Sequence, residues 1–418
     1  MRQFSLGLTL FTFAVLPFLT QCTGTPELDQ KSLETGYIGQ TTDSLLWKTL
    51  QSEQHFIRTV MADPKPYDVQ LIFTEITRDE EGNPSFAHET FQLNENAYFY
   101  PASTVKMPAA FLAAELFENP DAQLATVARQ IPLTLDTEFR MEEDTARTTL
   151  RQEITKIFVV SDNDAHNRMH DLIGRDRFNS MMAEKGLGPW RQAHRLGGPS
   201  QASAAEHRGI WFFAAGEDGT TIDSLFFQRE PARELEPLTI DGLQKGSAYV
   251  QNGELINEPF GFEYRNHAPL ASLQATLEAV IFPGFSSFGI TPAPSFDHSA
   301  ETVEFLNQAM RWYPDEGGYD DPDYYYDGYV KFFIYGDTFA PIPDHVKIAN
   351  KVGFAYGTLT DVAYITDSQN GIEFMLSGTI IVNKNGTFND NVYEYDEVGM
   401  PFLAEVGRQI YQRLLDAK

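Results

Sequence analysis

A serine and a lysine three positions apart form the first candidate chemical group in this chain of 418 residues. Ser103 and Lys106 follow the aromatic run Tyr98–Tyr100 and Pro101, where the pattern predicts that a helix begins. One helical turn would place both side chains on the same face near the positive end of the helix dipole. The amine could then reach the hydroxyl, which predicts an activated serine nucleophile. A helix N-cap followed by a surface lysine is the alternative.

A second group, Ser161-Asp162-Asn163, follows the apolar run Ile157–Val160 and precedes a segment with helical periodicity. A serine hydroxyl at this place could pass a proton, and an amide can both donate and accept hydrogen bonds towards a bound carbonyl. Because serine, aspartate and asparagine are also the preferred helix caps, a capping triplet is the alternative.

The third group, Lys351-Val352-Gly353, opens a predicted strand that continues from Phe354 to Gly357. A lysine at a strand start can aim a cation into a cleft, while a glycine two positions later lets the backbone lie close to a ligand. The alternative is a lysine that protects an edge strand from unwanted pairing.

The three groups occur in the order Ser-x-x-Lys, Ser-Asp-Asn and Lys-x-Gly. Together with the similarity of residues 100–106 and 350–365, this order resembles the class A β-lactamases and the wider group of penicillin-recognising serine hydrolases. The resemblance covers about residues 43–418 and is interrupted by a middle segment that is longer than usual. It implies a serine hydrolase that needs neither a metal nor an organic cofactor.

The resemblance also implies roles for the matching residues. Ser103 would be the acylated nucleophile, Lys106 its proton partner and Ser161 the group that passes a proton to the leaving nitrogen. The substrate-binding residues would be Asn163, Lys351, Gly353 and Phe354.

Within this set, Asn163 would hold the substrate amide and Lys351 would attract the substrate carboxylate. The backbone N–H groups of Ser103 and Phe354 would hold the oxyanion, because such donors point to where negative charge develops. For Lys106 to act as a base, its pKa must be lowered by burial or by a neighbouring cation such as Lys351.

Two departures from the family pattern bear on turnover. Val352 stands where the family usually has threonine or serine, so one hydroxyl contact to the substrate carboxylate is missing. Ser200 falls where the deacylating glutamate is expected, and the nearest carboxylate is Glu206. Without a positioned base the acyl-enzyme would be long-lived, as in a penicillin-binding protein.

The order of predicted elements indicates an α+β fold, with an antiparallel sheet built from both chain ends, flanking helices and a mostly helical lobe. Periodicity predicts helices at residues 44–61, 103–118 (bent at Pro108), 144–160, 164–186 and 402–415, and strands at 67–77, 86–93, 352–365 and 373–382.

The middle segment, residues 209–341, reads as an enlarged insertion. Residues 246–264 predict a hairpin, and residues 273–281 and 300–313 predict helices. The acidic, tyrosine-rich residues 315–327 lack the ligand spacing of a calcium-binding loop, so a solvated surface loop is expected.

The N-terminus predicts a lipoprotein-type signal peptide at residues 1–22. An arginine precedes the apolar run Leu6–Leu19, which is too short to span a membrane comfortably, and Cys22 follows it. Cys22 resembles the lipidated cysteine of a bacterial lipobox, although Gln21 departs from the usual small residue.

We therefore expect export across the inner membrane and a lipid anchor at Cys22, in the periplasm or outer membrane. Residues 23–42 would be a flexible tether and residues 43–418 the catalytic domain.

Composition excludes some classes of function. The net charge of −28 argues against nucleic acid as a partner, because a polyanion would be repelled. A single cysteine excludes an intrachain disulfide and a cysteine-rich metal site. His166 and His170 are four positions apart, but Asn167 replaces the glutamate of a zinc-protease motif, so no metal site is predicted.

These observations predict a hydrolase of the class A β-lactamase type that opens a β-lactam amide through an acyl-Ser103 intermediate. One alternative keeps the fold and is a D-Ala-D-Ala carboxypeptidase or transpeptidase that deacylates slowly. The other alternative is a cell-envelope lipoprotein that binds its ligand without catalysis.

Overall fold

The computed structural model describes residues 37–38, 44–197, 205–216 and 220–418. The predicted signal peptide with Cys22, most of the predicted tether and Ser200 lie outside these ranges. In the described ranges, no helix combines the length and the apolar character that a membrane span requires.

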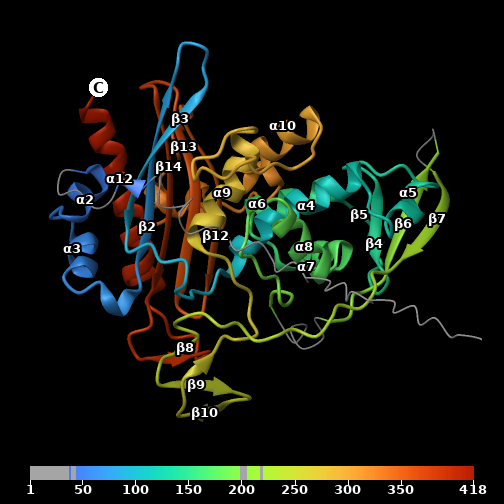
Figure 1. Ribbon diagram of the computed structural model, residues 1–418, viewed down its shortest axis with the longest axis horizontal. Coiled ribbons are helices and arrows are strands. Elements are labelled where there is room, and N and C mark those ends of the chain that lie inside the picture. Colours follow the sequence, from blue (N-terminus) through green and yellow to red (C-terminus); the bar gives the residue numbers. More distant parts are fainter. Residues whose placement is uncertain (1–36, 39–43, 198–204, 217–219) are drawn as a thin grey trace, which may run out of the picture.

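A six-stranded sheet runs through the centre of the fold, with the strand order β1-β3-β2-β14-β13-β12 (Figure 1). The neighbours are antiparallel, except that β1 runs parallel to β3. The strands are β1 (Tyr37–Ile38), β2 (Gln70–Arg78), β3 (Pro84–Phe91), β12 (Val346–Ala355), β13 (Thr358–Asp367) and β14 (Ile372–Ile381). The predicted α+β fold, with one sheet built from both chain ends, is confirmed.

Helices cover both faces of this sheet, and each face has its own apolar core. Leu71 and Phe73 of β2 point to one core and Ile72 to the other, because successive side chains of a strand alternate. The first core contains α2 (Leu45–Leu50), α3 (His55–Met61), α11 (Phe332–Tyr335) and α12 (Met400–Asp416). The second belongs to the helical lobe, with α4 (Lys106–Glu118), α5 (Ala125–Ala128), α6 (Leu150–Val159), α7 (Asn163–Ile173), α8 (Arg175–Glu184), α9 (Leu270–Ile281) and α10 (Ala300–Ala309).

Three small sheets extend the fold at its margins (Figure 1). They consist of β4 (Glu138–Met141), β5 (Thr148–Thr149), β6 (Ile210–Ala215) and β7 (Thr221–Phe227); of β9 (Ala248–Gln251), β10 (Glu254–Ile256) and β15 (Thr387–Phe388); and of β8 (Gln244–Lys245) and β11 (Phe260–Gly261). The predicted hairpin at 246–264 is present as β9 and β10, which turn at Asn252-Gly253.

The prediction of one strand over residues 352–365 is wrong, because two strands meet there. Tyr356 and Gly357 both have positive φ, +52° and +77°, and form the two-residue turn between β12 and β13. Both strands have few exposed residues because helices cover both faces of the sheet. A continuous apolar pattern of this kind conceals a turn.

The prediction of one helix over residues 44–61 is also wrong, because the segment forms two helices, α2 and α3. Glu89 of β3 accepts hydrogen bonds from the first N–H groups of α2, at 3.0 Å from Leu45 N. Glu405 of α12 does the same for α3, at 2.9 Å from Phe56 N and 3.2 Å from Ile57 N. Carboxylates from distant segments thus satisfy two separate helix N-termini.

Two further helix boundaries differ from prediction. Gly174, with φ +81°, separates α7 from α8 within the segment predicted as one helix. A 3₁₀ turn, Ala102–Val105, precedes α4, so Pro108 lies in the first turn of the α-helix. N–H groups in the first turn of a helix have no acceptor within the helix, so the missing N–H of Pro108 costs no hydrogen bond. The bend predicted at Pro108 is therefore not required.

Substituting Glu405 should test this tertiary capping. Because Gln54, the N-cap residue of α3, makes no side-chain capping bond, Glu405→Ala leaves two part-buried N–H groups at the start of α3 without an acceptor. We expect the free energy of unfolding to fall by about 1–2 kcal/mol in urea titrations. Glu397→Ala, at an exposed carboxylate just before α12, is the matched control. Equal losses in the two variants would contradict the capping role.

Candidate active site

A cleft of about 770 Å³ opens where the 3₁₀ turn before α4, the α6–α7 connection and β12 meet. Ser103, Ser161 and Asn163 line it, as do Val352 and Phe354. Residues predicted from three distant parts of the sequence therefore lie in one concave site, of a size typical for small-molecule ligands.

Gly353 brings β12 against the backbone of the candidate nucleophile. A Cβ at this position would lie 2.8 Å from Ser103 N and 2.7 Å from Pro101 O, closer than any side chain tolerates. Glycine therefore permits an approach that no other residue would allow. Ser103 itself is half-buried, and the next residue of β12, Phe354, lines the cleft with 56% of its surface exposed.

The α6–α7 connection presents Ser161 in a left-handed conformation, with φ +56°, which is uncommon outside glycine and asparagine. Asp162 is the N-cap of α7, and its Oδ1 accepts from Ala165 N at 2.7 Å. The capping alternative is thus correct for Asp162. The side chains of Ser161 and Asn163 instead contact Lys106.

Lys106 is fully buried beneath the cleft. Its Nζ donates to Asn163 Oδ1 at 2.7 Å, to Ser161 Oγ at 3.3 Å and to the Ser161 carbonyl. Burial lowers the pKa of Lys106 to about 7, although the negative charge of Asp162 opposes this shift. The surface-lysine alternative is therefore wrong, and about half of the amine is neutral near pH 7.

The predicted hydrogen bond between Lys106 and Ser103 is not present among the described residues. In the parts of the chain that the structure describes, the Ser103 hydroxyl makes no hydrogen bond, and the Lys106 amine is directed to Ser161 and Asn163. Catalytic hydrogen bonds are often long in unliganded sites and tighten when the substrate is bound.

Lys351 of β12 also contacts Ser161. Its Nζ donates to Ser161 Oγ at 2.8 Å and to the Val352 carbonyl at 2.8 Å. The side chain is only 2% exposed, so the alternative of a protective edge lysine is wrong. Burial lowers the pKa of Lys351 well below its ordinary value, and the neighbouring Lys106 lowers it further.

Two buried amines thus converge on one hydroxyl next to a half-buried serine. A neutral lysine can take a proton from a nucleophile, and a hydroxyl held between two amines can relay a proton to a leaving group. These are the residue types that acyl transfer through a serine nucleophile requires.

The loop after α8 brings no carboxylate to Asn163 within the described residues. Leu196 and Gly197 line the cleft there, and a Cβ on Gly197 would lie 3.0 Å from Asn163 Nδ2. Glu206 is exposed and absent from the cleft lining. Of the described lining residues, Asp396 alone carries a carboxylate.

Aromatic side chains that the motif analysis missed form much of the cleft wall. They come from residues 326–332, named here the 326–332 wall, and from the C-terminal segment: Tyr326, Tyr329, Phe332, Tyr393 and Tyr395. Residues 315–327 are exposed or partly exposed, as predicted for a surface loop, and Tyr326 at the end of this segment lines the cleft. The density of tyrosines was visible in the sequence, but no spacing rule connects these residues to Ser103.

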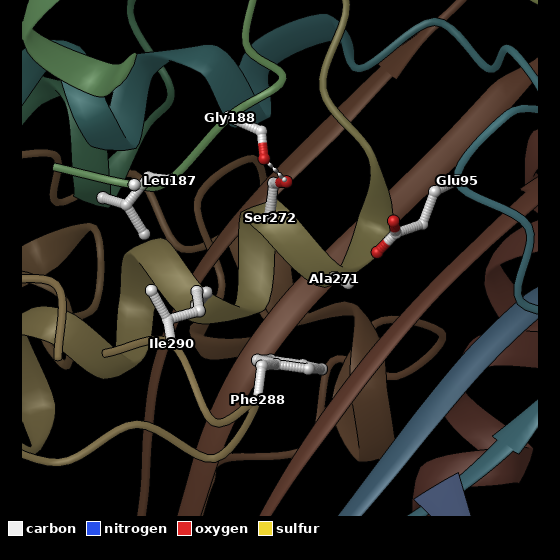
Figure 2. Close-up of a pocket in the computed structure, with 9 residues that line it drawn as sticks. Glu95, Leu187, Gly188, Ala271, Ser272, Phe288 and Ile290 are labelled. Carbon is white, nitrogen blue, oxygen red and sulfur yellow. Dashed lines mark hydrogen bonds between the residues drawn. The ribbon is translucent and has the colours of Figure 1, made fainter. Parts of the chain in front are cut away.

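A second pocket lies between α9 and the loop after α8, and it holds only about 10 Å³ (Figure 2). Glu95, Leu187, Gly188, Ala271, Ser272, Phe288 and Ile290 surround it. Ser272 Oγ donates to the Gly188 carbonyl at 3.2 Å across its edge. This space fits about one water molecule and is too small for a substrate.

His166 and His170 are buried in α7. In the described ranges, no group of three or more histidine, cysteine, aspartate or glutamate residues could hold a metal ion. His194, His207 and His267 are also buried, and burial lowers the pKa of each to about 4. These histidines are neutral parts of the fold near neutral pH.

Comparison with known proteins shows what this chain resembles. Residues 57–215 match the model of the Beta-lactamase enzyme family. The match confirms the predicted resemblance to β-lactamase-like serine hydrolases and supports the prediction that the chain is a hydrolase of the β-lactamase type. No curated protein sequence matches the chain.

Solved structures with a similar fold include two bacterial β-lactamases. The β-lactamase from Sphaerobacter thermophilus is 14% identical with a TM-score of 0.46, and the match covers 88% of this chain and 97% of that protein's chain. The β-lactamase from Xanthomonas campestris pv. campestris is 13% identical with a TM-score of 0.47, and the match covers 88% of this chain and 98% of that protein's chain. PBP-A is 14% identical with a TM-score of 0.45, and the match covers 90% of this chain and 97% of the PBP-A chain. These likenesses are too weak to assign individual residues.

The buried histidines predict a loss of stability in acid. A histidine that stays neutral in the fold at a pKa of about 4, against about 6.5 when unfolded, makes unfolding more favourable as the pH falls from 6.5 towards 4. Each contributes at most about 3 kcal/mol to this loss.

His267→Phe should therefore lose less stability between pH 7.5 and pH 5 than the wild type in urea titrations. Phenylalanine retains the ring that stacks against Tyr98 at 5.8 Å but cannot bind a proton. An identical loss in both proteins would show that His267 does not contribute.

Proposed function

We propose that the protein is a serine hydrolase of the class A β-lactamase type that acts on a β-lactam or a peptidoglycan-like amide through an acyl-Ser103 intermediate. The observation that carries the proposal is the convergence of the Lys106 and Lys351 amines on Ser161, beside Ser103, in the floor of one cleft. The family match of residues 57–215 supports the same class of chemistry.

Acylation would begin when Ser103 Oγ forms a bond to the carbonyl carbon and its proton passes to the neutral Lys106 amine. The backbone N–H groups of Ser103 and Phe354 would hold the resulting oxyanion, where β12 lies against the 3₁₀ turn. Collapse of this intermediate breaks the C–N bond. Ser161 Oγ, which is hydrogen-bonded by both lysines, would deliver the proton to the leaving nitrogen.

Asn163 and Lys351 would bind the substrate. The Oδ1 of Asn163 accepts from Lys106, which orients its Nδ2 as a donor for a substrate carbonyl. Lys351 would attract the carboxylate only in its protonated form. Val352 is only 2% exposed and has no hydroxyl. The substrate carboxylate would therefore lack the hydroxyl hydrogen bond that the family pattern provides beside this lysine.

A slow-deacylating, penicillin-binding type of enzyme is the second candidate. It is favoured by the Leu196-Gly197 backbone beside Asn163, where no described carboxylate is positioned to activate water. The acyl group would then persist on Ser103.

For location, we propose export and a lipid anchor at Cys22, as the N-terminal sequence indicates. Incorporation of labelled fatty acid into the full-length chain, and its loss in Cys22→Ser, would test this.

Intact mass spectrometry after incubation with penicillin should test acylation. We expect an adduct on the wild type and none on Ser103→Ala, with a chromogenic cephalosporin opened only by the wild type. A lasting adduct without turnover supports the second candidate. If the wild type forms no adduct with any β-lactam tested, the proposal for β-lactams fails and a binding role without catalysis remains.

The pH dependence of acylation should report on Lys106. Because the neutral amine is the base and its pKa is about 7, the rate should rise with pH around 7 and fall about tenfold per pH unit well below it. Asp162→Asn keeps an N-cap side chain for α7 but removes the charge that raises the pKa of Lys106. The profile of this variant should shift to lower pH, and an unshifted profile would argue against Lys106 as the base.

A further inference from the structure

Behind the cleft, three buried polar residues form a continuous hydrogen-bonded chain. Lys331 Nζ donates to Asn350 Oδ1 at 2.8 Å, and Asn350 Nδ2 donates to Asp361 Oδ1 at 2.8 Å. Lys331 and Asp361 are fully buried, and Asn350 is 2% exposed. Neither the serine motifs nor the proposed mechanism uses these residues, although each would be expensive to bury without its partners.

This chain of residues joins the 326–332 wall to the central sheet. Asp361 Oδ2 accepts from Phe332 N at 3.1 Å and from Phe333 N at 3.2 Å. The Asn350 amide also donates to the Val330 carbonyl at 2.8 Å. Val330 and Phe332 line the cleft, so the part of the wall nearest to β12 is held through its backbone.

The same chain holds the strand that carries Lys351. Asn350 immediately precedes Lys351, and Asp361 of β13 pairs with Val352 in the sheet register. Because neighbouring side chains on a strand point to opposite faces, Asn350 lies on the other face of β12 from Lys351. Lys331 also donates to the Met310 carbonyl at the end of α10, at 2.7 Å, which fixes its own position.

We propose that Lys331, Asn350 and Asp361 form a clamp that positions Lys351 and the 326–332 wall for the acylation of Ser103. These are positioning residues, since they act through β12 and the wall rather than by touching the substrate. The proposal rests on the proposed function for its catalytic consequence. The clamp itself rests on the hydrogen bonds described above.

Charges around the clamp act on Lys351 in opposite directions. Burial is the largest influence and lowers the pKa of Lys351; Lys106 and Lys331 also lower it, whereas Asp361 raises it. The charged groups near Lys331 itself are Asp361, Arg311, Glu316 and Lys347. Removing one charged member of the clamp should therefore raise or lower the pKa of Lys351, depending on which member is removed.

The test compares Lys331→Met, Asp361→Asn and the double variant with Lys347→Met. The matched control, Lys347, is a partly exposed lysine of β12 outside the clamp. Titration of ¹³Cε-labelled lysines by NMR gives the pKa of Lys351 directly, and Lys351→Arg identifies its signal. This measurement needs no substrate, so it remains informative if β-lactams do not acylate Ser103.

Loss of the Lys331 cation should raise the pKa of Lys351, and loss of the Asp361 carboxylate should lower it. Lys347→Met should leave the pKa of Lys351 unchanged. The double variant should return towards the wild-type value and folds even if a single variant, with one uncompensated buried charge, does not. Shifts of the same sign in both single variants, or none, would overturn the clamp.

Acylation supplies the second readout. In Lys331→Met the acylation rate constant with penicillin should fall by about ten- to a hundredfold, since a misplacement of about 1 Å can cost a hundredfold in rate. Hydrogen exchange should become faster at residues 328–335 and stay unchanged in α4. If the NMR shifts appear but the wild type is never acylated, the proposed function fails and the clamp stands. If the wild type is acylated normally and none of these changes occurs, the clamp fails alone.

Discussion

The burial of two lysine amines against a single serine hydroxyl is the interaction on which the rest of the site depends. Lys106 comes from the helical lobe and Lys351 from the central sheet, and both donate to Ser161 in the turn between α6 and α7. Charged amines are unfavourable in a dry interior, so burial lowers both pKa values. The same contacts that join the lobe to the sheet thus favour neutral amines.

This arrangement requires compensation from the surrounding residues. Asp162 favours the charged form of Lys106 from one side, and Asp361 does so for Lys351 from the other. Lys331 and Asn350 complete the polar set behind β12. The balance of these few charges decides how much of each lysine is neutral at a given pH, which links the stability of the lobe–sheet junction to reactivity.

The middle segment, residues 209–341, contributes directly to this site. Its residues 326–332 supply tyrosine and phenylalanine side chains to the cleft, and its Lys331 enters the buried polar set behind the strand of Lys351. The C-terminal segment adds Tyr393 and Tyr395, and the Tyr395 hydroxyl accepts from Gly357 N at 2.8 Å in the β12–β13 turn. A floor built from the three sequence motifs is therefore combined with aromatic walls from the middle and C-terminal segments, and the walls face whatever is bound there.

By itself, the sequence determined the α+β order and the two-ended sheet, because periodicity is a short-range property. The residues of the cleft floor were predicted from the order of three motifs and their resemblance to a family pattern, since each motif alone also fitted a structural role. Only the tertiary structure decided that Lys106 turns to Ser161, that Gly353 touches the Ser103 backbone and that Glu89 and Glu405 divide the first helix. It alone revealed the 326–332 wall and the role of Lys331. These contacts join residues far apart in the chain, and their energies depend on burial, which no local pattern records.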